Sequence, residues 1–226
     1  MLFFGAFLIT GPFTIIRFDA SEAQELLWDG FLSLAFFIQH SGTIRPSFRT
    51  RLLSAIPSHY HPATYAIASG AVLTTVVLLW QPSQTVLVEI QGPLQVLLRT
   101  LSFLAIAGFV WGVWALRTFD PFGQAPIALR LRGKPQRAPR FALRGPYFWV
   151  RHPLYFFVLV LIWSTPSVNS DRLLFNVLWT SWIVSGASLE ERDLVAEFGE
   201  RYRHYQKTVP MLLPWRGPVG RGLGSS

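Results

Sequence analysis

The stretch GPYFWVRHPLYFFVLVLIWST, residues 145–165, joins a polar motif to an apolar run. A second apolar run, Leu173–Ala187, follows a short turn and stops just before Glu190 and Glu191. A membrane-spanning helix needs about 20 mostly apolar residues, and shorter runs are tolerated when the helix tilts or the bilayer thins. The two runs therefore predict a hairpin of membrane helices. Both ends of such a hairpin lie at the same membrane face, so we expect the polar motif to face the two glutamates.

The composition of the chain agrees with a membrane protein. Of 226 residues, 51% are hydrophobic and only 14% are charged, whereas soluble domains carry about 25% charged residues. The chain contains no cysteine, which excludes disulfides, a zinc–thiolate site and a nucleophilic thiol. We expect no metal site, and any covalent chemistry must use other groups or a bound cosubstrate.

Four further apolar segments precede the hairpin. The six candidate spans are Leu2–Ile16, Leu26–Ile38, Pro62–Trp80, Leu94–Leu116, Leu154–Thr165 and Leu173–Ala187. The first is short and the second contains Asp29, so five or six of them cross the membrane. No basic residues precede the first segment, so we do not expect a cleaved signal peptide. The fold class that follows is all-α, a polytopic integral membrane helical bundle.

The chain reads as one membrane-embedded domain over residues 1–214. Its N-terminal helices occupy 1–116, and a connection rich in Gly and Pro occupies 117–152. The hairpin and a helix lying along the interface occupy 153–214. Residues 215–226 are rich in Gly and end in two serines, which predicts a flexible tail.

The basic residues predict the orientation. If both termini are cytoplasmic and six segments cross, the cytoplasmic stretches hold three, eight and six Lys or Arg residues, which is 17 of the 20 in the chain. The positive-inside rule favours this topology, with the paired polar clusters at the cytoplasmic face. The net charge of +8 is then a topogenic signal, with some contact to anionic lipid, and we expect no nucleic acid partner. The location that we expect is a bacterial inner membrane.

The polar clusters at the two ends of the hairpin are the candidate site. His152 and Tyr155 are three residues apart and share a helix face. Glu190 and Glu191 follow the expected end of the second helix, where carboxylates oppose the helix dipole and cost about 0.3–1 kcal/mol each. They call for a cationic partner, and Arg151 or a bound cation would supply one.

Each cluster also has a structural interpretation. Arg151 and Arg192 can be membrane anchors, and His152 can be an interfacial histidine. The two glutamates can be ordinary solvated charges. Tyr202 and Tyr205 share a face and are most often packing residues on an interfacial helix. Spacing alone leaves these alternatives open.

The motifs resemble a known superfamily. The pattern consists of Gly145, Tyr147, Val150, Arg151, His152, Pro153 and Tyr155, then a hydrophobic hairpin, then Glu190, Glu191, Leu194, Phe198, Gly199, Tyr202 and Tyr205. It is similar to that of the isoprenylcysteine carboxyl methyltransferases and phospholipid methyltransferases, which include NnrU-like proteins. Earlier segments narrow the resemblance to the bacterial methanethiol S-methyltransferase family. These segments are 39–41 with 45–46, 119–123, 132–135 and 209–214.

The resemblance implies an integral membrane enzyme that uses S-adenosylmethionine. It places the cofactor between the hairpin and the interfacial helix. The residues that it implies for cofactor binding are Gly145, Tyr147, Arg151, His152, Tyr155, Glu190, Glu191, Tyr202 and Tyr205. One of the glutamates would address the amino group or ribose hydroxyls of the cofactor, and Arg151 and His152 would lie on its carboxylate side.

The family also implies the acceptor, a small apolar thiol that arrives from the bilayer. The nucleophile is a thiolate, and a simple alkanethiol is at least as weak an acid as free Cys, whose pKa is about 8.5. A nearby cation or base favours ionisation. The catalytic candidates are His40, Arg45, Arg151 and His152. A lipid-like acceptor, either a prenylcysteine carboxylate or a phospholipid amine, and a non-catalytic NnrU-like membrane protein remain alternatives.

Overall fold

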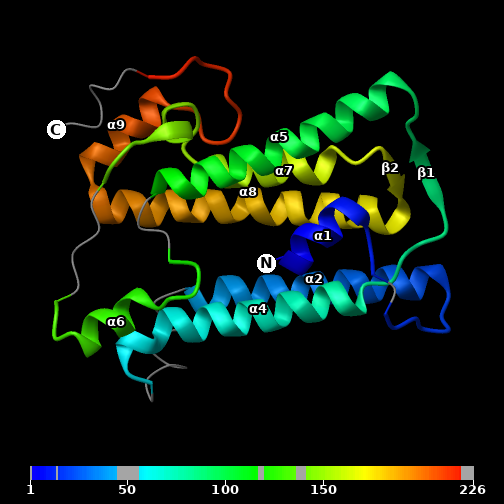
Figure 1. Ribbon diagram of the computed structural model, residues 1–226, viewed down its shortest axis with the longest axis horizontal. Helices are drawn as coiled ribbons and strands as arrows, with labels where there is room; N and C mark the ends of the chain where they lie inside the picture. Colours follow the sequence, from blue (N-terminus) through cyan, green and yellow to red (C-terminus); the bar gives the residue numbers. More distant parts are fainter. Residues whose placement is uncertain (1, 14, 45–55, 117–119, 136–140, 220–226) are drawn as a thin grey trace. The chain divides into compact units, whose positions relative to one another are not determined.

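The computed structural model describes residues 2–13, 15–44, 56–116, 120–135 and 141–219. Helices make up most of this part of the chain (Figure 1). In chain order the elements are α1 (Leu2–Thr10), α2 (Glu22–Ile44), η1 (Ser58–Tyr60), α4 (His61–Leu79), β1 (Val86–Glu89), α5 (Pro93–Leu116), α6 (Ala125–Leu131), η2 (Gly145–Phe148), α7 (Pro153–Trp163), β2 (Ser167–Asn169), α8 (Ser170–Phe198) and α9 (Glu200–Thr208).

The chain forms two compact units. Unit 1 comprises Met1–Leu87, Asp120–Ala138 and Val168–Trp179. Unit 2 comprises Val88–Phe119, Pro139–Ser167 and Thr180–Ser226. The long helix α8 runs through both units. The single domain predicted over residues 1–214 stays a prediction.

In unit 1, a buried polar network joins the end of α4 to the first turn of α8. Both oxygens of Asp171 accept hydrogen bonds, from Nε1 of Trp80 at 3.1 Å and from the backbone nitrogen of Ser83 at 3.1 Å. The backbone nitrogen of Gln81 donates to Oδ1 of Asp29 on α2, at 2.9 Å. Buried polar groups are costly without partners, so this network specifies how the ends of these helices meet.

In unit 2, α5 packs along α7 through a pair of glycines. A Cβ atom at Gly108 would lie 2.2 Å from the ring of Phe157, and one at Gly112 would lie 2.7 Å from Cδ2 of Leu154. The two glycines are four residues apart and share one face of α5, so the backbones of the two helices approach closely. This spacing positions α7, and with it the motif that precedes α7.

The helices match the predicted spans with several corrections. The first helix ends at Thr10 instead of Ile16, because Gly11 adopts a positive φ of 86° and Pro12 follows. α2 begins four residues before the predicted start, and α8 continues to Phe198, eleven residues past its predicted end. The predicted spans ended where the apolar residues end, but α2 and α8 extend into polar residues.

The smaller elements η1, β1, α6, η2 and β2 were not predicted from the sequence. The pure all-α prediction is wrong in detail, because β1 and β2 pair in a two-stranded sheet. Helix α6 lies within the Gly- and Pro-rich connection given for residues 117–152. The prediction of a helix beyond the hairpin is confirmed by α9, which follows α8 after Gly199.

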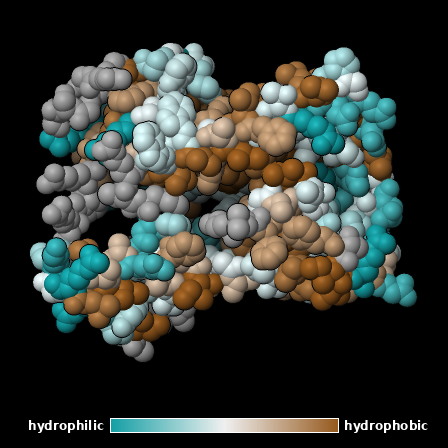
Figure 2. Space-filling view, in the orientation of Figure 1, coloured by the Kyte–Doolittle hydropathy of each residue, from teal (hydrophilic) through white to brown (hydrophobic). Residues whose placement is uncertain are grey.

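Two helical segments in the described part of the chain are long and apolar enough to cross a membrane, Ser58–Leu79 and Pro93–Leu116. Helix α7 is apolar but shorter. In Figure 2, hydrophobic residues gather over parts of α4 and α5, and hydrophilic residues gather around β1. On α5 the side chains of Val96, Phe103 and Trp114 are exposed by 64%, 68% and 73%. Such apolar exposure fits a helix that faces lipid.

Candidate active site

The polar motif lies where η2 passes into α7. Gly145 has a φ of 55°, and a Cβ atom there would lie 3.0 Å from Cβ of Ala115. Pro153 occupies the first turn of α7, where its missing N–H is tolerated. Arg151 and His152 therefore stand just before the helix. Their backbone nitrogens donate to the carbonyls of Pro210 and Met211, at 2.9 and 3.1 Å.

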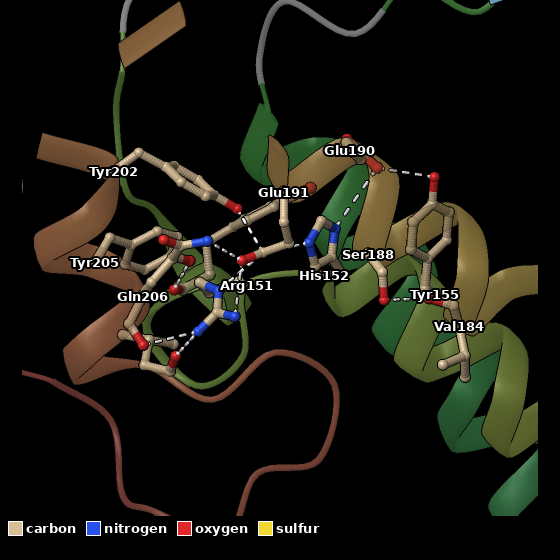
Figure 3. Close-up of polar contacts among 12 residues, drawn as sticks. Arg151, His152, Tyr155, Val184, Ser188, Glu190, Glu191, Tyr202, Tyr205 and Gln206 are labelled. Carbon is tan, nitrogen blue, oxygen red and sulfur yellow. Dashed lines mark hydrogen bonds and ion pairs between the residues drawn. The ribbon is translucent and has the colours of Figure 1, made fainter. Parts of the chain in front are cut away.

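The carboxylate of Glu191 is the centre of the site (Figure 3). Oε1 of Glu191 lies 2.9 Å from Nε of Arg151, 2.7 Å from Nε2 of His152 and 2.7 Å from the hydroxyl of Tyr202. Oε2 lies 2.8 Å from Nη2 of Arg151 and 2.6 Å from Nε2 of Gln206. The side chains of Arg151 and Glu191 are each 9% exposed, so this bidentate ion pair is largely withdrawn from water.

These contacts set the protonation of Glu191. Burial raises the pKa of the carboxyl, but hydrogen bonds from His152, Arg151, Tyr202 and Gln206 outweigh it and hold the pKa well below the ordinary value. Glu191 is therefore an anion at neutral pH. Because a carboxylate only accepts hydrogen bonds, the Nε2 atom of His152 must carry a proton.

Glu190 differs from its neighbour. Its side chain is 45% exposed, and its Oε2 atom accepts a hydrogen bond from the hydroxyl of Tyr155 at 2.9 Å. The same oxygen lies 3.6 Å from Nδ1 of His152. The rings of His152 and Tyr155 stack at 5.5 Å with an angle of 11° between their planes. Glu190 is thus an accessible carboxylate held beside the second nitrogen of the imidazole.

The tyrosines of α9 belong to the packing of this site. Tyr202 and Tyr205 are 2% and 3% exposed and form a core cluster with Leu143 and Val209. The hydroxyl of Tyr205 donates to the carbonyl of Tyr147 at 2.5 Å. Burial raises the pKa of both α9 tyrosines, and contact with Glu191 adds to the rise for Tyr202, so both keep their protons and act as donors.

Comparison with known proteins identifies the family. The chain is 34% identical over 202 residues to Methanethiol S-methyltransferase 1 of Bradyrhizobium diazoefficiens, a match that covers 89% of this chain and 71% of that protein. It is 38% identical over 210 residues to Methanethiol S-methyltransferase of a Pseudomonas species, with 88% and 79% covered. The chain belongs to the methanethiol S-methyltransferase family. This confirms the resemblance drawn from the motifs.

A more distant similarity connects the family to another group. The chain is 27% identical over 191 residues to Nurim of Rattus norvegicus, with 78% of this chain and 70% of that protein covered. No family profile matches the chain, and no solved structure matches it significantly.

Several predicted site residues meet within unit 2. Around Glu191 the structure gathers Arg151, His152, Tyr155, Glu190, Tyr202, Tyr205 and, through its carbonyl, Tyr147. Gly145 supplies the turn that leads into the motif. One premise was wrong: Glu190 and Glu191 lie within α8, not at a helix end, so the helix dipole is not what calls for Arg151.

The two remaining catalytic candidates are not among the described residues of unit 2. His40 is in α2 of unit 1, where its ring lies 2.8 Å from the hydroxyl of Tyr65 and packs at a tilt against Phe36. Its catalytic role stays a prediction. Arg45 lies outside the described residues. In the part of the chain that the structure describes, no group of three or more His, Cys, Asp or Glu could hold a metal ion.

Sequence reasoning missed part of the site. Gln206 holds Glu191 through its side chain, and its carbonyl accepts from Nη1 of Arg151 at 3.0 Å. The same nitrogen of Arg151 donates to the carbonyl of Val209. Val219, in the predicted flexible tail, donates its N–H to the carbonyl of Phe148 at 3.1 Å and packs against the α9 core cluster. The flexible tail expected over residues 215–226 stays a prediction. Backbone contacts of this kind leave no pattern in side-chain types.

Proposed function

We propose that this chain is an integral membrane methyltransferase that transfers a methyl group from S-adenosylmethionine to methanethiol, giving dimethyl sulfide. The support is the family together with one feature of the site. The exposed carboxylate of Glu190 lies beside an ion-pair network in which both oxygens of Glu191 already have partners. The names of the relatives supply the substrate class. The long apolar helices support a bilayer location, and the basic loops support a bacterial inner membrane with five or six spans and a cytoplasmic site.

The residues around Glu190 fit this donor. S-adenosylmethionine supplies a methyl group on a sulfonium cation, and it also carries an amino group and ribose hydroxyls. Glu190 has an exposed carboxylate, of which one oxygen takes a hydrogen bond from Tyr155, so the carboxylate can accept donors from an amino group or hydroxyls. It is better placed for this than Glu191, whose two oxygens already accept five contacts.

Arg151 and Glu191 have a different role in this proposal. Arg151 gives four of its five N–H groups to Glu191 and to the carbonyls of Gln206 and Val209. It thereby ties α8, the motif and the segment after α9 together. The pair of Arg151 and Glu191 keeps the elements around the donor site in position. Glu190, Tyr155 and His152 contact the donor.

The rate of methyl transfer depends more on the alignment of the reacting atoms than on a charge placed against the sulfonium. The sulfonium charge disappears as the methyl group leaves, so a carboxylate that gripped it would stabilise the ground state and gain nothing in turnover. Contact of Glu190 with the amino or hydroxyl groups avoids this. The rate then comes from holding acceptor sulfur, methyl group and leaving sulfur in line.

Purified protein in detergent tests the proposal. With S-adenosylmethionine and methanethiol it should release dimethyl sulfide, measured by gas chromatography. Glu190→Gln should weaken binding of S-adenosylhomocysteine on the order of tenfold, because a charged hydrogen bond contributes about 1.5–3 kcal/mol. Glu200→Gln is the matched control, since Glu200 is an exposed α9 residue paired only with Arg203 among the contacts described.

Two results would contradict the proposal. A bound donor without any dimethyl sulfide would refute the thiol acceptor, and prenylcysteine and phospholipid acceptors would then be tested in the same assay. Unchanged affinity in Glu190→Gln would refute the assignment of Glu190 to the donor.

A further inference from the structure

The imidazole of His152 is held between two carboxylates of opposite character. Nε2 lies 2.7 Å from the buried Glu191, and Nδ1 lies 3.6 Å from the exposed Glu190. The ring itself is 6% exposed and stacks on Tyr155. Figure 3 shows the ring lying between the two glutamates.

The first contact fixes the tautomer. Glu191 is an anion held by Arg151, so it needs a proton on Nε2 of His152. In the neutral ring the lone pair then lies on Nδ1. The separation of 3.6 Å between Nδ1 and Glu190 is longer than a hydrogen bond, as expected of two acceptors.

The second contact places a carboxylate beside the nitrogen that carries the lone pair. The charged and titratable groups that face His152 in unit 2 are Arg151, Glu190, Glu191, Tyr155 and Tyr202. With neutral imidazole and neutral tyrosines these groups sum to one negative charge, because Arg151 offsets only one glutamate. A proton on Nδ1 makes the sum zero and gives Glu190 a donor.

We propose that Nδ1 of His152 takes the proton of the thiol acceptor, with Glu191 as the positioning residue that keeps this nitrogen unprotonated beforehand. The inference rests on the proposed function and deepens it by naming the base. The arrangement follows the logic of a carboxylate that orients a histidine base.

The step balances in atoms and charge. The S–H bond of the thiol breaks, and its proton bonds to Nδ1. The thiol sulfur forms a bond to the methyl carbon while the bond from that carbon to the sulfonium sulfur breaks, and the electron pair stays on the departing sulfur. His152 gains a positive charge in the turnover that removes the sulfonium charge. The net charge of the site is therefore unchanged. Nδ1 of His152 then gives the proton to Glu190, and the exposed Glu190 releases it to water.

Two thiols of different acidity separate this role from simple positioning. The variant is His152→Gln, whose amide can still donate to Glu191 but has no basic nitrogen. The substrates are methanethiol and 2,2,2-trifluoroethanethiol, which ionises more readily. With methanethiol we expect the single-turnover rate to fall at least about 100-fold, the usual scale for losing a general base. With the acidic thiol the fall should be less than about tenfold. Glu191→Gln should show the same selective loss, which a purely structural role would not produce.

Equal losses on both thiols, or no loss on either, would overturn the base and leave the proposed function intact. If wild-type protein binds S-adenosylhomocysteine but methylates neither thiol, both proposals fail. The wild-type pH profile gives a test that needs no variant. A rate with methanethiol that levels off below the ionisation range of the free thiol supports the base. A rate that rises tenfold per pH unit up to that range overturns it.

Discussion

Asp171 in unit 1 and Glu191 in unit 2 are both buried carboxylates on α8, and they do different things. Asp171 is 3% exposed and accepts from the uncharged donors Trp80 and Ser83. Glu191 is 7% exposed and accepts from a guanidinium and an imidazole as well as from neutral groups. Burial raises the pKa of Asp171, whereas the contacts of Glu191 hold its pKa below the ordinary value despite burial.

The residue beside each carboxylate explains the difference in role. Arg172 follows Asp171, is 8% exposed and gives a hydrogen bond to the carbonyl of Leu8 at 2.6 Å. Through Ser83 that network also reaches the exposed Glu22 of α2, whose carboxylate accepts hydrogen bonds from the hydroxyls of Ser83 and Thr85. Glu190 precedes Glu191 and is half exposed, so the second network ends at a group that can bind a ligand. A buried carboxylate alone therefore does not indicate a site. What distinguishes the network of Glu191 is its buried ion pair with Arg151 and its contact with His152, directly beside the exposed Glu190.

The largest predicted effects on stability come from replacing Glu191 or Asp171 with alanine. Glu191→Ala leaves Arg151 and His152 without their anion, and breaking a buried ion pair in this way costs about 3–5 kcal/mol. Asp171→Ala removes a carboxylate that accepts hydrogen bonds from neutral donors and interacts with the buried Arg172 without a salt bridge among the contacts described, and it should cost about 1–3 kcal/mol. Unfolding in detergent and binding of S-adenosylhomocysteine measure both. We expect Glu191→Ala to lose binding and Asp171→Ala to retain it. Equal losses of stability, or lost binding in Asp171→Ala, would remove the distinction between the two networks.

A smaller effect is expected at the turn that places α9 over Glu191. Gly199 has φ 59° and ψ −133°, a conformation that is essentially restricted to glycine. Gly199→Ala should therefore cost about 1–3 kcal/mol and loosen the contact of Tyr202 with Glu191. Gly186→Ala is the control, because Gly186 lies within α8, where nothing within 4 Å would meet a Cβ atom. It should be neutral or stabilise by about 0.5–1 kcal/mol. Similar losses in both variants would show that the turn is not strained.

The sequence predicted the partners of the site better than their arrangement. The hairpin argument brought Arg151 and His152 to Glu190 and Glu191, because antiparallel helices return the chain to the same end. It could not predict the different roles of the two glutamates. Neighbouring residues of a helix point in different directions, and this rotation leaves Glu190 exposed while Glu191 is buried. Gln206 escaped notice because a lone glutamine after a tyrosine motif carries no chemical pattern.

The limits of the helices show a related difficulty. Hydropathy placed the end of the last span at Ala187, where the apolar residues stop, yet α8 continues for three more turns. A helix continues through polar residues where tertiary packing stabilises it. In this part of α8, Leu194 and Val195 pack against the α9 core cluster. The close packing of α5 on α7 was available in the sequence as two glycines four residues apart, and it was overlooked.

The smallest predicted effect is a difference in pH response between the two networks. The low pKa of Glu191 means that its contribution to stability is complete above about pH 4.3, the unfolded value, and is lost as the pH falls below it. The raised pKa of Asp171 has the opposite sign. The folded state then binds a proton more readily than the unfolded state, so acidification down to about pH 3.9 favours the fold around Asp171.

Hydrogen exchange, corrected for its intrinsic pH dependence, can follow both networks in one sample. Between pH 6 and pH 3.5 we expect protection to fall at the amides of Arg151 and His152, which bond to Pro210 and Met211. Protection at the amide of Ser83, which bonds to Asp171, should hold or rise. Glu191→Gln should flatten the first response and Asp171→Asn the second, since an amide does not titrate in this range. Parallel responses at the two sites would mean that the carboxylates share one electrostatic environment, and the contrast between a ligand-binding network and a structural one would fail.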